Sequence, residues 1–290
     1  MSAGAKFREI LAKKGLVEAM AAHSPLSAML AAEAGFDAIW ASGFELSAMY
    51  GVPDVSIVTM TQHLDMMRAM AERSGIPVVA DIDTGFGNAI NVLYAVEQYE
   101  RAGAAAIVME DKSFPKVTSL IAGGRQDMVR IEEFQGKIEA ARAARRDKDT
   151  VIVARTEALI AGLGQDEALK RARAYEAAGA DLILVHSKQK TPDEIEAFVR
   201  AWDGKAPLAL VPTAYPQMTV ARVRELKKIG LLIWGNHAIR ASVGAMRRTF
   251  AQIRKEGGIH GVESQIASVD EVFDLQGMGK VKADEKRFLR

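Results

Sequence analysis

Short apolar runs alternate along the chain with longer segments in which apolar residues recur every three or four positions. The runs predict strands that are buried on both faces, and the longer segments predict helices. We expect strands at residues 16–21, 36–42, 76–83, 104–111, 150–157, 180–187, 207–213 and 231–236. We expect helices at residues 1–15, 89–101, 131–144, 166–178, 192–202 and 220–228.

The alternation predicts an α/β fold of the TIM type, a (β/α)8 barrel, with a doubly wound sheet as the alternative. Glycine closes several expected helices directly before a strand, as at Gly35, Gly103, Gly179 and Gly230. Each glycine suits the position after a helix, where a positive φ is needed. We expect one domain over residues 1–290, with the barrel at about 16–257 and a C-terminal arm at about 258–290.

The composition excludes several classes of protein and is consistent with the expected fold. The chain has 290 residues, 49% of them hydrophobic, and 38 basic residues balance 37 acidic ones. Disorder is excluded, and without a basic patch we expect no nucleic-acid partner. No segment approaches the roughly 20 apolar residues of a membrane span, and no export signal is visible. The chain has no cysteine, which removes thiolate chemistry and fits a cytoplasmic protein.

Each expected strand is followed by residues that can take part in chemistry. In a barrel the carboxyl ends of all the strands meet at one mouth, so these side chains are expected to form one site. They are Ser42, Asp81, Asp83, Glu110, Asp111, Arg155, Glu157, His186, Thr213, Asn236 and His237. Two longer connections, residues 43–60 and 112–128 with Gly123-Gly124, are expected to be lids or binding loops.

Asp81 and Asp83 would lie on the same side of a strand, where two carboxylates need a cation or a shared proton. Mg²⁺ prefers such oxygen ligands, and Glu110 would join them from the next strand. The alternative is a structural ion network with Arg155 and Lys112. Arg155 is suited to a carboxylate or phosphoryl group but also to a structural salt bridge.

Five motifs together resemble the phosphoenolpyruvate mutase branch of the isocitrate lyase superfamily. They are WASG (40–43), DIDTGFGN (81–88), EDKSFPK (110–116), VARTE (153–157) and VHSK (185–188). The resemblance covers nearly the whole chain. It implies a barrel whose last helix, at about 237–257, is exchanged between subunits, in a homotetramer of two such pairs.

The resemblance also implies a Mg²⁺ site, with Mn²⁺ or Co²⁺ as alternative ions, and a small α-keto phosphonate substrate. Asp81 would bind the metal directly, and Asp83 and Glu110 mainly through water. Around the substrate it implies Trp40, Ser42, Gly43 and Arg155, with Asp54 beside the reacting phosphorus and Lys116, Thr118 and Ser119 on a closing loop. His186 would donate a hydrogen bond or a proton, although a purely structural histidine is the alternative.

Departures from the family motifs bear on the reaction. The lyases of the superfamily carry a Lys-Lys-Cys-Gly-His motif after the fourth strand, and this chain has EDKSFPK and no cysteine. The mutases have asparagine where this chain has Thr118, and a threonine hydroxyl can position water. We therefore expect Mg²⁺-dependent hydrolysis of the C–P bond of 3-phosphonopyruvate. The alternatives are a phosphoenolpyruvate mutase, a related α-keto acid lyase or decarboxylase, and a catalytically silent barrel.

Overall fold

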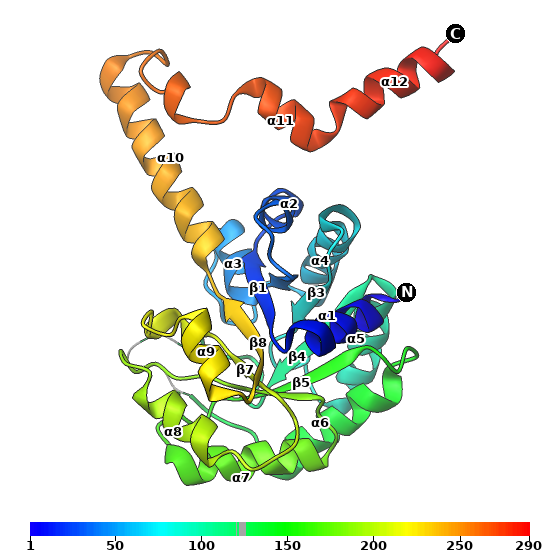
Figure 1. Ribbon diagram of the computed structural model, residues 1–290, viewed down its shortest axis with the longest axis vertical. Coiled ribbons are helices and arrows are strands. Elements are labelled where there is room, and N and C mark those ends of the chain that lie inside the picture. The colour runs from blue at the N-terminus through cyan, green and yellow to red at the C-terminus, as the bar shows by residue number, and fades with distance from the viewer. Residues whose placement is uncertain (120, 122–125) are drawn as a thin grey trace. The chain divides into compact units, whose positions relative to one another are not determined.

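Eight parallel strands close into a barrel in the computed structural model, which describes residues 1–119, 121 and 126–290 (Figure 1). The strands are β1 (Val17–Ala22), β2 (Ala38–Ala41), β3 (Val78–Asp81), β4 (Ala104–Glu110), β5 (Val151–Thr156), β6 (Leu182–Val185), β7 (Leu208–Leu210) and β8 (Ile229–Trp234). Each strand pairs with its neighbours in the sequence, and β8 pairs with β1. The TIM-type barrel is confirmed, and the doubly wound sheet is excluded.

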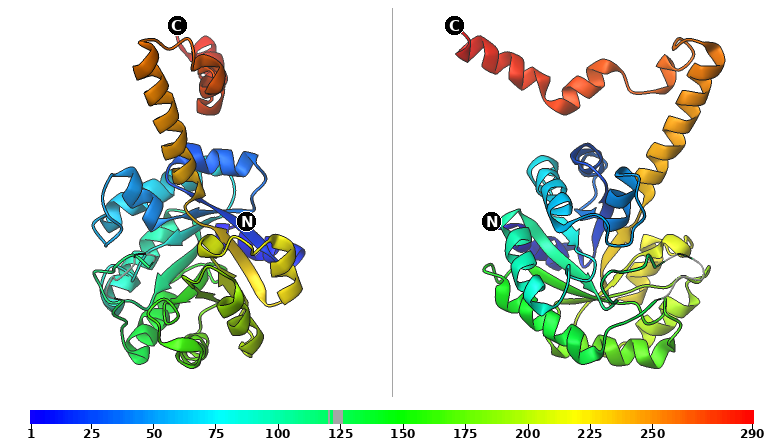
Figure 2. Two further views of the ribbon diagram at one scale, coloured as in Figure 1. Left: turned by 90° about the vertical axis from the view of Figure 1, so that its left-hand side faces the viewer. Right: turned by 180° about the vertical axis from the view of Figure 1, so that it is seen from behind.

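One helix precedes β1, and the helices between the strands connect them and pack around the outside of the barrel (Figure 2). They are α1 (Ala3–Lys14), α2 (Pro25–Glu33), α3 (Gly43–Met49), α4 (Met60–Ser74), α5 (Ala89–Arg101), α6 (Ile131–Ala144), α7 (Gly164–Ala177), α8 (Asp193–Ala201) and α9 (Val220–Leu226), with a 3-10 turn at Pro212–Ala214. Several begin at a side-chain cap; Thr59, for example, starts α4 in a capping box with Gln62. The first long connection, expected as a loop, thus begins with helix α3.

The barrel interior is filled by small and branched apolar side chains. Alternate residues of each strand point inward, and the inner cluster includes Val17, Ala19 and Ala21 from β1. Phe7 of α1 is fully buried in the same cluster, so the N-terminal helix contributes to this core. A second, larger cluster lies between the outer faces of the strands and the surrounding helices. The two layers hold the strand ends in fixed positions.

Three of the four helix-ending glycines behave as predicted. Gly35, Gly103 and Gly179 have φ values of 88°, 95° and 100°, in the left-handed region. The prediction for Gly230 was wrong, because α9 ends earlier and Lys227 takes the left-handed conformation with φ of 57°. Gly230 lies inside β8, where a Cβ would stand 2.8 Å from Cβ of Pro207, so close approach explains this glycine.

The chain divides into two compact units, Met1–Ala238 and Ile239–Arg290. Helix α10 (His237–Glu256) starts in the first and continues into the second, which also contains a 3-10 turn at Glu263–Gln265, α11 (Val269–Gln276) and α12 (Met278–Phe288). The domain limits expected from the sequence stay a prediction. Among the described residues, no helix is long and apolar enough to cross a membrane.

Candidate active site

Every second residue of a strand points into the barrel, and at the carboxyl ends of the strands these inward positions hold residues that can bind or react with a ligand. On β2 the inner residue Ala38 is followed two positions later by Trp40, and on β5 the inner residue Val153 is followed by Arg155. On β4 the inner residue Val108 is followed by Glu110. The periodicity that builds the apolar core therefore continues into polar residues where the strands end.

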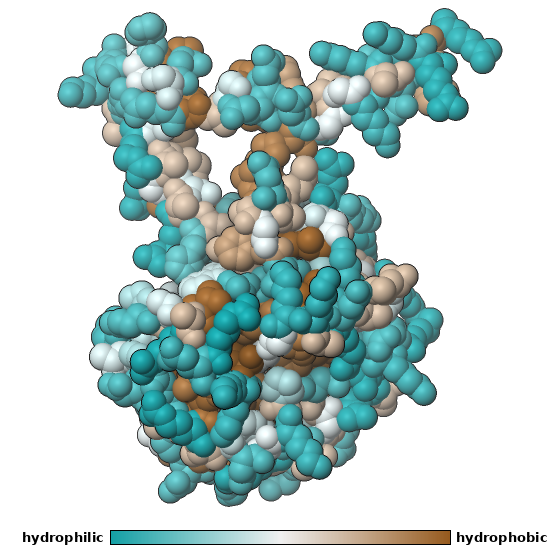
Figure 3. Space-filling model, in the orientation of Figure 1, coloured by the Kyte–Doolittle hydropathy of each residue, from teal (hydrophilic) through white to brown (hydrophobic). Residues whose placement is uncertain are grey.

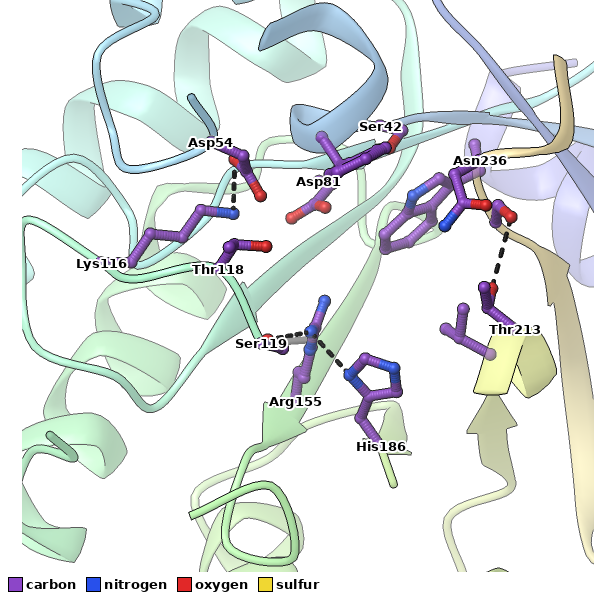
Figure 4. Close-up of a pocket in the computed structure, with 14 residues that line it drawn as sticks. Ser42, Asp54, Asp81, Lys116, Thr118, Ser119, Arg155, His186, Thr213 and Asn236 are labelled. Atoms are coloured by element: carbon purple, nitrogen blue, oxygen red, sulfur yellow. Dashed lines mark hydrogen bonds and ion pairs between the residues drawn. The ribbon is translucent and has the colours of Figure 1, made fainter. Parts of the chain in front are cut away.

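A cavity of about 210 Å³ opens at this mouth (Figure 4). It gathers most of the predicted site residues, including those from the long connections after β2 and β4. The cavity is lined by Trp40, Ser42, Phe44, Asp54, Asp81, Lys116, Thr118, Ser119, Arg155, His186, Val211, Thr213, Gly235 and Asn236. Four other predicted residues do not line it but contact residues that do or lie against them: Gly43, Asp83, Glu110 and Glu157. Asp111 and His237 were also expected at this mouth, but neither lines the cavity; Asp111 pairs with Arg171, and His237 begins α10.

The acidic side of the site has oxygen atoms without hydrogen-bond partners. Both carboxylate oxygens of Glu110 and Oδ1 of Asp83 are buried and accept no hydrogen bond from the described residues, although Asp83 Oδ1 and Glu110 Oε2 lie within ion-pair distance of a cation. Burial raises the pKa of Asp81, although Lys116 and Arg155 oppose the shift, and burial raises the pKa of Asp83 to about 7. Buried carboxylate oxygens that accept no hydrogen bond favour a bound cation. The donor set consists of oxygen atoms, as Mg²⁺ prefers.

The described residues of the site do not provide enough side-chain ligands to surround a metal ion by themselves. Within the described part of the chain, no three side chains of His, Asp or Glu form a set that would hold a metal ion. Mg²⁺ commonly keeps several waters and takes one or two carboxylates from the protein. The residues therefore fit Mg²⁺ with Asp81 as a ligand and with Asp83 and Glu110 nearby.

Asp83 reaches this site by a route that differs from the expected one. Strand β3 ends at Asp81, and Asp83 has φ of 53°, so simple strand alternation does not bring the two carboxylates together. The Asp83 carbonyl instead accepts a hydrogen bond from the Glu110 amide at 2.8 Å. Gly43 packs closely here, since a Cβ on it would lie 2.8 Å from Oδ1 of Asp83.

Lys116 neutralises the carboxylates on the side of the long connections. Its Nζ lies 2.6 Å from Oδ1 of Asp83 and 3.0 Å from Oδ1 of Asp54. Burial disfavours the ammonium ion, but the nearby carboxylates outweigh that effect and raise the pKa of Lys116 above its usual range. Lys116 is therefore a permanent cation that holds Asp54 at the cavity (Figure 4).

Arg155 is the second fixed cation and lies in a buried network. Its Nε lies 2.5 Å from Oε1 of Glu157 and 3.3 Å from Oε2 of Glu110. Its Nη2 donates to Ser119 Oγ at 3.0 Å and lies 3.0 Å from Nδ1 of His186. Burial lowers the pKa of His186, so this imidazole is neutral near pH 7. These residues present one cation and neutral donors to a cavity ligand.

Phe44, Val211 and Gly235 line the cavity but were not predicted as site residues. Thr213 and Asn236 were predicted at this mouth from their places at the strand ends, without a particular role, and both line the cavity. Phe44 and Val211 are apolar, so no chemical signal marks them in the sequence. Glu157 was predicted at the end of its strand, but its ion pair with the buried guanidinium of Arg155 was not. Gly123-Gly124 of the long connection lies outside the described residues.

Comparison with known proteins identifies relatives over the full chain. The family model described as phosphoenolpyruvate phosphomutase matches residues 7–254. Phosphonopyruvate hydrolase of Variovorax sp. (strain Pal2) is 61% identical over 290 residues, covering 100% of both chains. Phosphoenolpyruvate phosphomutase of Tetrahymena pyriformis is 42% identical and covers 98% of this chain and 94% of its own. A crystal structure of phosphonopyruvate hydrolase with oxalate and Mg²⁺ superimposes with a TM-score of 0.95, at 60% identity and full coverage of both chains.

Proposed function

The chain belongs to the phosphoenolpyruvate phosphomutase family, and from this membership we propose that it is a Mg²⁺-dependent hydrolase of 3-phosphonopyruvate. The reaction is phosphonopyruvate + H₂O → pyruvate + phosphate. The observation that carries the choice of hydrolysis is the 61% identity, over the whole of both chains, with a phosphonopyruvate hydrolase. Thr118 supports hydrolysis, because its hydroxyl lines the cavity at the position where the phosphoenolpyruvate mutases have the amide of an asparagine.

The keto acid end of the substrate would lie at the acidic side of the cavity. Asp81 would hold Mg²⁺, with Asp83 and Glu110 acting mainly through water, and Trp40 and Ser42 line the space beside it. When bound, Mg²⁺ acts as a Lewis acid that stabilises the enolate charge of the departing pyruvate. The side chains around it exclude bulk water from the carbon that leaves.

The phosphoryl end would lie against Arg155. Its guanidinium is held by Glu157 at 2.5 Å and by Ser119 at 3.0 Å, so it keeps a fixed orientation toward the cavity. Phosphoryl transfer depends chiefly on positioning and on neutralising the oxygens, both of which a fixed guanidinium provides. The neutral imidazole of His186 adds a hydrogen-bond donor beside it.

Water would attack phosphorus from the side of the long connections. Thr118 orients the water through its hydroxyl, and Asp54 accepts the proton; direct attack by Asp54 on phosphorus is the alternative. The contact of 3.0 Å between Lys116 Nζ and Asp54 Oδ1 fixes the carboxylate for this task. Lys116 also adds positive charge near the transferred group.

We also propose that the chain assembles as a homotetramer of two pairs of subunits, each pair exchanging its last helix. The C-terminal unit carries exposed apolar residues, and Figure 3 shows brown patches on its otherwise hydrophilic surface. They include Val243, Met246, Phe250, Ile259, Ile266, Val269, Phe273, Val281 and Phe288. Side chains of this kind are usually covered by a partner. The cytoplasmic location stays a prediction from the sequence.

Thr118→Ala tests the assignment to hydrolysis. Removing the hydroxyl should lower the rate of phosphate release at least about tenfold, because the attacking water loses its orienting partner. Thr191→Ala is the matched control, since Thr191 donates to Asp193 on the surface. Release of pyruvate and phosphate is measured in parallel. Unchanged hydrolysis by Thr118→Ala would refute the role of Thr118.

A further inference from the structure

Lys112 is a buried lysine that the reaction outlined above does not use. Its side chain is 1% exposed, and it is absent from the residues that line the active-site cavity. Its Nζ donates to the Val117 carbonyl at 2.7 Å and to Ser119 Oγ at 2.8 Å. The third contact is an ion pair with Oε2 of Glu157 at 3.3 Å. All three ammonium hydrogens therefore have an acceptor within reach.

These contacts close a ring of four side chains. Lys112 binds Ser119, Ser119 accepts from Arg155, Arg155 binds Glu157, and Glu157 returns to Lys112. The ring joins the connection after β4 to the end of β5. Val117 and Ser119 flank Thr118 in the sequence, so Lys112 holds the backbone carbonyl before that residue and the side-chain hydroxyl after it.

The ring determines what the Ser119 hydroxyl can do. Its oxygen accepts from two cations, the Lys112 ammonium and the Arg155 guanidinium, and a hydroxyl oxygen has two lone pairs. With both lone pairs occupied, the hydroxyl hydrogen is left to be donated to a third partner. Ser119 lines the cavity beside Arg155, where an anionic oxygen of a ligand would accept that hydrogen (Figure 4).

We propose that Lys112 is a positioning residue that acts through Ser119, fixing its hydroxyl as a donor to the phosphoryl group next to Arg155. The inference rests on the proposed function for the identity of that group. A lysine that served only to stabilise the barrel would need no partner in the cavity wall. Lys112 instead places two of its three contacts on the segment that carries Thr118 and Ser119.

The test compares Lys112→Met, Ser119→Ala and the double variant, with Lys228→Met as the control. Lys228 also donates to backbone carbonyls, those of Arg200 and Trp202, but it does not line the cavity. We expect Lys112→Met to lower kcat/KM for phosphonopyruvate by about 10- to 100-fold. The double variant should lie within about threefold of Lys112→Met, because both changes remove one shared interaction. Additive losses, or a Lys112→Met variant within twofold of the wild type, would overturn the proposal.

Binding of inorganic phosphate, measured by calorimetry with Mg²⁺ present, separates this inference from the proposed function. Lys112→Met should weaken phosphate binding about tenfold, and Lys228→Met should leave it unchanged. If the wild type hydrolyses no phosphonopyruvate, the proposed function fails, while loss of phosphate binding in Lys112→Met still supports the role of Lys112. Unchanged phosphate binding would overturn that role. If Lys112→Met does not fold by circular dichroism, Lys112→Gln, which keeps a donor on a shorter side chain, is held to the same criteria.

Discussion

Gly43 is the position at which adding a single methyl group should disturb the metal site most directly. It is the first residue of α3, and a Cβ built on it would lie 2.8 Å from Oδ1 of Asp83. Ordinary contacts of this kind begin at 3.4 Å, so the carboxylate would have to move by about 0.6 Å. The same oxygen lies 2.6 Å from Lys116 Nζ, which leaves it little freedom to move. Gly43→Ala therefore displaces Asp83 relative to Lys116 and Asp81.

The expected loss follows from that displacement. Changes to groups that support a metal ligand typically cost 10- to 100-fold in metal affinity or activity. We expect Gly43→Ala to lower kcat for phosphonopyruvate by about 10- to 100-fold, or about 1.4–2.7 kcal/mol in the barrier. The Mg²⁺ concentration needed for half-maximal activity should rise. The unfolding temperature should not fall much, because alanine is a good helix former.

The assay follows pyruvate release at a series of Mg²⁺ concentrations, alongside thermal unfolding. Gly136→Ala is the matched control, since Gly136 lies inside α6 and a Cβ there meets no atom within 4 Å. This control should keep its activity and gain up to about 1 kcal/mol of stability. Wild-type kcat and wild-type Mg²⁺ dependence in Gly43→Ala would refute the close packing of Asp83 against Gly43.

Four further expectations concern Asp54, Asp83 and Tyr175. Asp54→Ala should lose more than about tenfold in turnover, and a smaller loss would mean that Asp54 is neither base nor nucleophile. Because burial raises the pKa of Asp83 to about 7, Mg²⁺ affinity should weaken as the pH falls below about 7, and Asp83→Asn should flatten that titration. In the metal-free protein the same shift makes the free energy of unfolding fall as the pH rises from about 4 to about 7, since the unfolded carboxyl ionises first. Tyr175→Phe removes a 2.7 Å hydrogen bond to buried Asp111 and should cost about 1.5–3 kcal/mol by calorimetry; an unchanged unfolding temperature would contradict this.

The barrel was predictable because its strands are buried on both faces and its helices are amphipathic. The expected strands all exist, although most are shorter than their apolar runs; β6, for instance, covers Leu182–Val185. Apolar character extends beyond the paired residues, so the sequence pattern overstates strand length. The strand ends also predicted Asp81, Arg155 and His186 at one mouth, and all three line the cavity.

Contacts between segments that are distant in the sequence were harder to predict. The conformation of Asp83 depends on a turn with φ of 53°, which strand alternation does not anticipate. The ring that includes Lys112 and Glu157 depends on side chains that meet from β5 and from the connection after β4. Gly230 was misassigned because glycine occurs both at helix ends and where another residue packs closely against the backbone, as Pro207 does here. The sequence alone does not distinguish the two cases.

The most direct test of hydrolysis is a ³¹P NMR time course of the purified protein with 3-phosphonopyruvate and Mg²⁺, repeated with EDTA. The proposed function predicts that the phosphonate signal is replaced by inorganic phosphate with Mg²⁺ present, and that EDTA abolishes the conversion. Phosphoenolpyruvate as the product would contradict hydrolysis in favour of isomerisation. An unchanged spectrum with Mg²⁺ would contradict both reactions.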